Sequence, residues 1–142
     1  MSVRFRCQDA AVSSRDPYPR NPQLADGVMK RLAPTLRGRE HDGVRVAAVV
    51  HYGAVSIDAK HLVVWLLLEG RPDDQIPEWL TLTPTLVESL RPPHVDYDWL
   101  LALRSEVMEA FQDAGWPDPD GPSVCVDSEH RVSTGGGWNY FR

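Results

Sequence analysis

The sequence has little cysteine and no long apolar segment. Its two cysteines, Cys7 and Cys125, lie far apart and belong to no CxxC or Cys/His pattern, which argues against a disulfide framework or a zinc site. The longest apolar run, residues 62–68, is too short to cross a bilayer, and the first residues lack the apolar core of a signal peptide. We therefore expect a cytoplasmic protein with reduced thiols and no membrane partner.

Lysine is also scarce, and the positive charge is scattered along the chain. Only Lys30 and Lys60 are lysines among the 15 basic residues, whereas 20 residues are acidic and the formal net charge is −5. Nucleic acids are held by clustered positive charge, so we do not expect a nucleic-acid partner. An acidic surface suits a basic protein partner or simple solubility, and a homo-oligomer stays open.

The three glycines at residues 135–137 lack the pattern of a phosphate-binding loop. They have neither the GxGxxG nor the GxxxxGK[ST] spacing, and the five residues after them are too few for a helix that would face an anion. We expect a hairpin turn that leads into a final strand. Trp138, Tyr140 and Arg142 share one face of that strand and either pack on a helix or bind a partner.

Apolar periodicity predicts an α+β fold. The expected elements are an edge strand at residues 3–7, a helix capped by Asn21 that Pro34 ends or kinks, strands at residues 44–57 and 61–69, a short helix at residues 83–90, a long helix, and strands at residues 124–126 and 131–133. This order predicts one domain over residues 1–142, with residues 1–20 as an arm or loop. Its mainly antiparallel sheet consists of two β-hairpins, packed against the long amphipathic helix and one or two shorter helices.

One expected strand and the long helix have sequence features that indicate where they lie or end. The run at residues 62–68 is apolar on both faces and belongs in the sheet interior, while Gly53 in the preceding strand is read as a bulge. The long helix begins after Asp96, a good cap, and ends at Gly115, where Trp116 can pack back on Phe111.

The histidines offer one alternative site. His51 and His61 flank the turn of the first hairpin with Asp58 between them, and His130 lies at the second hairpin. If both hairpin ends met, these side chains could hold a catalytic metal or supply a general base. No HExxH or other fixed spacing supports a ligand set, so histidines satisfied locally at strand ends are the simpler interpretation, with no cofactor and no metal.

No side chain has the surroundings of an activated nucleophile. Cys125 lies between two valines and is expected to be a buried, inert thiol. The run Ser128-Glu129-His130 does not predict a triad, because there is no GxSxG elbow and adjacent strand residues point to opposite faces. The sequence therefore favours a protein that is not an enzyme.

Two stretches resemble a known class of proteins. The run IDAKHLVVWLLLEG at residues 57–70 and the run VDSEHRVSTGGGWNYFR at residues 126–142 are similar to a pattern in small bacterial proteins, some of them immunity proteins to polymorphic toxins. The resemblance implies a small, acidic, cytosolic inhibitor and assigns no residue. Our leading expectation is a protein-binding domain, of the immunity type, that covers its partner's surface. The alternative is a small enzyme or ligand-binding protein with the histidine site described above.

Overall fold

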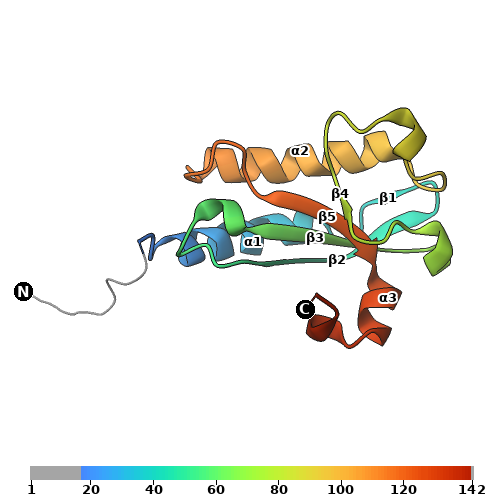
Figure 1. Ribbon diagram of the computed structural model, residues 1–142, viewed down its shortest axis with the longest axis horizontal. Helices are drawn as coiled ribbons and strands as arrows, with labels where there is room; N and C mark the ends of the chain where they lie inside the picture. The colour runs from blue at the N-terminus through green and yellow to red at the C-terminus, as the bar shows by residue number, and fades with distance from the viewer. Residues whose placement is uncertain (1–16, 142) are drawn as a thin grey trace, which may run out of the picture.

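The computed structural model describes residues 17–141, so the strand expected at residues 3–7 lies outside the described residues (Figure 1). The helices and strands are α1 (Asn21–Leu36), β1 (Glu40–His41), β2 (Val44–Tyr52), β3 (Val63–Glu69), β4 (Leu80–Thr81), α2 (Tyr97–Asp113), β5 (Ser123–Ser128) and α3 (Glu129–Thr134). Short 3-10 turns are η1 (Ala59–His61), η2 (Asp73–Gln75), η3 (Glu88–Leu90) and η4 (Gly137–Phe141). No helix in this part of the chain combines the length and apolar character needed to cross a membrane.

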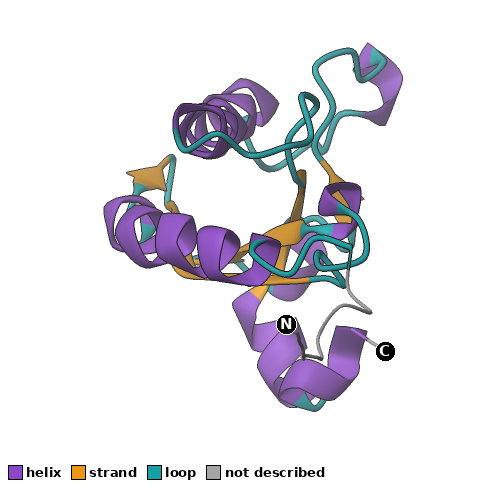
Figure 2. Cartoon of the chain, turned by 90° about the vertical axis from the view of Figure 1, so that its left-hand side faces the viewer, coloured by secondary structure: helices purple, strands orange, loops and turns teal. Residues whose placement is uncertain are grey.

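The five strands form one mixed sheet in the order β1-β2-β3-β5-β4. The β3–β5 pair is parallel and the other three pairs are antiparallel. Helices α1 and α2 pack on one face of this sheet, while α3 and η4 cover part of the other (Figures 1 and 2). The predicted α+β class and the mostly antiparallel sheet are confirmed.

Strand β3 lies at the centre of the sheet, as its continuous apolar run predicts. Val64, Leu66 and Leu68 are fully buried in the core beneath α1 and α2. Trp65 and Leu67 point to the opposite face and belong to a second core with Val132 of α3. Because successive side chains of a strand alternate between faces, a strand covered on both sides must be apolar throughout.

A bulge in β2 changes which face its side chains occupy. The pairing with β3 shifts between Val46 and Ala48. Val46 therefore lies in the first core, whereas Ala48 packs against the second. The bulge predicted at Gly53 was misplaced: Gly53 has a φ of 141°, and a side chain there would lie 2.1 Å from the carbonyl oxygen of His61. Glycine is needed at this position for a close backbone approach.

The long helix α2 has the predicted ends. Asp96 Oδ1 accepts hydrogen bonds from the amides of Asp98 and Trp99, at 3.0 and 3.4 Å. At the other end Gly115 has a φ of 81°, and Trp116 packs its ring edge-on against Phe111 at 5.3 Å between centroids. The contacts at both ends of α2 are made by residues within the helix or next to it in sequence. The sequence alone therefore predicts where α2 begins and ends.

The ends of α1 differ from the prediction. The helix begins at Asn21, but the side chain of Asn21 does not cap it and instead donates to the carbonyl of Val55 at 2.9 Å. Pro34 lies inside the last turn, and α1 continues to Leu36. The helix expected at residues 83–90 is reduced to the 3-10 turn η3.

The chain after β5 also differs from the prediction. The residues expected to form a strand at 131–133 belong to helix α3, and the expected final strand is the 3-10 turn η4, so the second hairpin is absent. Ser128 explains the change, because its hydroxyl accepts from the amide of Arg131 at 3.2 Å and caps α3. Strand β5 pairs instead with β3, in parallel, and with the two-residue β4. Gly135 and Gly136 connect α3 to η4, whose first residue is Gly137, and none of the three glycines joins two strands.

Candidate functional site

The histidines of the alternative site lie at opposite ends of the parallel strand pair. Val63 pairs with Ser123 and Leu68 pairs with Ser128, so His61 precedes this pair whereas His130 follows it. A rise of about 3.3 Å per residue separates the two ends by roughly 17 Å. Within residues 17–141, no group of three or more histidine, cysteine, aspartate or glutamate side chains is placed to hold a metal ion. The alternative site would require the ends of two hairpins to meet, but the second hairpin does not form and His130 lies at the far end of β5 from His61.

Each of these histidines has a local partner instead. His51 Nε2 lies 2.8 Å from Asp26 Oδ1 of α1, and His61 Nδ1 lies 3.2 Å from the carbonyl oxygen of Ala54. Asp58 accepts from the amide of Lys60 at 3.0 Å and so caps η1. It also borders an open cavity of about 360 Å³, whose charged lining is Asp58, Lys60, Asp118 and Asp120.

The thiol and hydroxyl groups near β5 also have structural roles. Cys125 is buried as predicted, and burial raises the pKa of its thiol. Ser128 is buried and donates its hydroxyl to Asp73 Oδ1, while His130 Nδ1 lies 2.8 Å from Asp73 Oδ2. The serine therefore bonds to the carboxylate and not to the imidazole, which is the reverse of what nucleophile activation needs.

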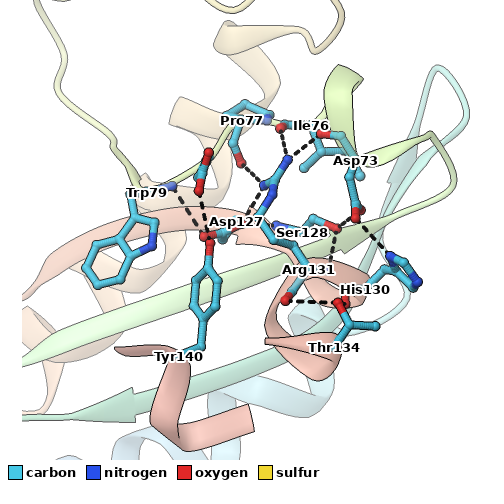
Figure 3. Close-up of polar contacts among 11 residues, drawn as sticks. Asp73, Ile76, Pro77, Trp79, Asp127, Ser128, His130, Arg131, Thr134 and Tyr140 are labelled. Atoms are coloured by element: carbon cyan, nitrogen blue, oxygen red, sulfur yellow. Dashed lines mark hydrogen bonds and ion pairs between the residues drawn. The ribbon is translucent and has the colours of Figure 1, made fainter. Parts of the chain in front are cut away.

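The most connected group of polar side chains lies at the carboxyl end of β5 (Figure 3). Its centre is Asp127, whose side chain is fully buried and whose Oδ1 lies 2.6 Å from Arg131 Nη1. The same carboxylate accepts from the amides of Ser128 and Trp79, at 2.6 and 3.4 Å. A buried carboxylate needs such partners, because an unpaired charge away from water is strongly unfavourable.

Arg131 joins this carboxylate to the loop that precedes β4. Its guanidinium donates to the carbonyl oxygens of Ile76 and Pro77, at 3.3 and 3.4 Å, and also to that of Asp73. Only 19% of the Arg131 side chain is exposed. The planar guanidinium, with its five donors, is suited to holding several oxygens at once, so it fixes the loop against α3.

Trp79, at the end of this loop, has an unusual backbone. Its φ is 52°, and Asp42 is the other non-glycine residue with a positive φ within residues 17–141. Asp42 precedes Gly43 in the β1–β2 turn, where a positive φ is ordinary. For a bulky residue the left-handed conformation costs roughly 1–2 kcal/mol, so contacts elsewhere must hold Trp79 in it.

Those contacts leave much of the indole in solvent. The ring packs edge-on against Trp65 at 5.3 Å and lies tilted against Tyr140 at 5.9 Å between centroids. Even so, 48% of Trp79 is exposed. Figure 3 shows Trp79 and Tyr140 side by side next to Asp127. Glu78, an exposed neighbour, accepts from the Tyr140 hydroxyl at 3.3 Å. We call Glu78, Trp79 and Tyr140 the Trp79 patch.

Tyr140 belongs to both the patch and the polar group beneath it. Burial and the neighbouring carboxylate of Asp127 raise the pKa of Tyr140 to about 12. The sequence predicts that Trp138, Tyr140 and Arg142 share a partner-binding face. Of these three, Tyr140 lies next to the exposed indole of Trp79. The side chain of Trp138 and all of Arg142 lie outside the part of the chain that the structure describes.

Sequence reasoning missed Trp79, Asp73, Asp127 and Arg131. One local signal is present, because Asp127 directly follows the apolar run at residues 124–126 and Arg131 comes four residues later. The pair meets across the end of β5 and the first turn of α3, where the sequence predicts separate strands at residues 124–126 and 131–133, so the spacing does not reveal the contact. Trp79 carried no local signal within its proline-rich surroundings.

Comparisons with known proteins add no family. No protein-family model, no curated protein and no solved structure matches this chain.

Proposed function

We propose that this chain is a protein-binding domain that acts by covering a surface of its partner, with Trp79 as the central anchor. The observation that supports the proposal most directly is the combination of an exposed indole and a left-handed backbone at one residue. Folding alone gains little from this arrangement, because it stores backbone strain and leaves about half of a large apolar residue exposed to water. Residues with such strain cluster at functional sites.

The chemistry of the patch also favours a protein partner. Tryptophan and tyrosine are the residues most enriched among those that dominate binding energy, because a rigid ring buries a large area at a low entropy cost. The backbone amide of Trp79 donates a hydrogen bond to Asp127, and Arg131 holds the preceding loop through the carbonyl of Ile76. The indole ring therefore lies on a preorganised support. Preorganisation lowers the entropy lost on binding.

We propose more specifically that the protein is an immunity-type inhibitor, which binds a toxin and covers its surface. The two stretches with the resemblance to immunity proteins contain β3, the last three residues of β5, α3 and η4. These elements support the patch, and η4 supplies its Tyr140. Inhibition by surface occlusion needs no catalytic group on the inhibitor. A toxin domain is therefore the first class of partner to test.

The test is a parallel capture from a lysate of the source cells, with wild-type protein and two variants as baits. Trp79→Ala removes the anchor, and Leu90→Ser alters a residue that is 66% exposed in η3, outside the patch. We expect a stoichiometric partner that wild type and Leu90→Ser retain and that Trp79→Ala loses. Retention of the same partner by a folded Trp79→Ala variant would contradict the proposal.

A further inference from the structure

The exposed part of Trp79 is an aromatic surface in an acidic setting. Aromatic faces carry a partial negative charge and attract cations. The loop and the start of α3, residues 73–79 and 127–131, contain one arginine and five carboxylate residues: Asp73, Asp74, Glu78, Asp127 and Glu129. Of these carboxylates, Glu78 is the exposed neighbour of Trp79 in sequence and contacts Tyr140, which favours a positively charged group next to the ring.

The single arginine of this region does not occupy that position. Arg131 directs its guanidinium toward Asp127 and the loop carbonyls, and only 19% of its side chain is exposed. Glu78 is exposed, and its Oε2 accepts from the Tyr140 hydroxyl. That contact holds the carboxylate beside the aromatic rings, while the charge itself stays accessible to solvent.

We propose that the Trp79 patch receives an arginine side chain of the partner, stacked on the Trp79 indole with the Glu78 carboxylate as its counter-ion. This inference rests on the protein-binding function proposed above and specifies the group recognised. Arginine fits better than lysine, because a planar guanidinium can stack on an indole while its N–H groups reach a carboxylate in the same plane. The partner would thus present a basic segment, which the net negative charge of the protein would also attract.

The test uses short capped peptides as probes and the full chain as the receptor. Tetra-arginine is compared with tetra-lysine and with tetra-citrulline, which has nearly the same shape as tetra-arginine without the charge. Binding is followed by NMR through the indole N–H of Trp79, identified by its loss in Trp79→Phe. We expect tetra-arginine to shift this signal, tetra-lysine to bind more weakly, and tetra-citrulline to leave the signal unchanged.

Two charge variants supply the matched control. Glu78→Gln removes the counter-ion and is expected to weaken tetra-arginine binding roughly three- to tenfold, whereas Glu88→Gln removes an exposed carboxylate from η3 and should leave it unchanged. Equal weakening by both variants would show general attraction to an acidic protein and would overturn the inference. Equal binding of tetra-arginine and tetra-citrulline would overturn it as well.

The outcomes separate this inference from the function on which it rests. If the peptides fail to discriminate charge while Trp79→Ala still loses the captured partner, arginine recognition is wrong and the protein-binding function stands. If Trp79→Ala retains the partner, the proposed function itself fails. Circular dichroism of each variant verifies that any loss of binding does not come from unfolding.

Discussion

Asp127 and Arg131 form the most deeply buried ion pair in the described part of the chain, with 2.6 Å between Oδ1 and Nη1 and no exposure of the aspartate side chain. The pair joins three segments, because the aspartate lies near the end of β5, the arginine lies in α3, and both contact residues 73–79. Trp79 is thus presented by a support whose integrity depends on one buried charge pair.

Removing the arginine should destabilise the protein strongly. Arg131→Met leaves the Asp127 carboxylate buried without its charged partner, and we expect the free energy of unfolding to fall by about 3–5 kcal/mol. Urea denaturation followed by circular dichroism measures the change. The double variant Asp127→Asn/Arg131→Met removes both charges and should be more stable than Arg131→Met alone. Equal instability of the single and double variants would contradict this account of the pair.

The backbone strain at Trp79 can be separated from the loss of its ring. Trp79→Ala and Trp79→Gly both remove the indole, but only glycine adopts the observed φ of 52° without steric cost. After allowing for the greater freedom of glycine in the unfolded chain, we expect the glycine variant to be more stable than the alanine variant by about 0.5–1 kcal/mol. Thermal and urea denaturation give the difference. An alanine variant that is the more stable of the two would show that this residue is not strained.

Tyr140 should make stability depend on alkaline pH. Its pKa is raised to about 12 in the folded protein, against about 10 in an unfolded chain. The unfolded state therefore loses this proton first, and the stabilisation, complete below about pH 10, is lost as the pH rises toward about 12. We expect Tyr140→Phe to lose less stability over this interval than wild type. Urea midpoints across the interval provide the measurement, and identical slopes for the two proteins would refute it.

Asp73 should make stability depend on acidic pH. Hydrogen bonds from Ser128 and His130 lower the pKa of Asp73, so its stabilisation is present above the unfolded value of about 3.9 and is lost as the pH falls through the lower folded value. We expect Asp73→Asn to be less stable than wild type at neutral pH and less sensitive to acid. Asp74→Asn, at an exposed neighbour, is the matched control. Equal acid sensitivity of wild type and Asp73→Asn would count against this role.

The helices and strands that the sequence predicts correctly are those whose own residues, or the residues directly flanking them, determine their type and ends. Strand β3 has a continuous apolar run, and α2 has Asp96 at one end and Gly115 at the other. Each of these signals depends on residues close in sequence or on simple burial. The class of the fold follows from them, because the order of helices and strands restricts the possible layers.

The elements that were mispredicted depend on contacts between distant residues. Helix α3 has six residues, too few to show a helical period, and its start depends on the Ser128 hydroxyl. The sequences of β5 and β3 do not indicate that the two strands pair in parallel, because a buried apolar strand is compatible with parallel and with antiparallel pairing. Trp79 takes its conformation beside Asp127, a residue 48 positions away, so no local pattern could mark it as a site.

The central claim is that Trp79 anchors a protein partner, and the most direct test is isothermal titration calorimetry with the purified partner. Wild type is compared with Trp79→Ala and with Leu90→Ser, which alters an exposed apolar residue outside the patch. We expect Trp79→Ala to raise Kd by about 30-fold or more, the loss expected when a dominant interface residue is truncated, and Leu90→Ser to leave Kd unchanged. An unchanged Kd for a folded Trp79→Ala variant would contradict the central claim.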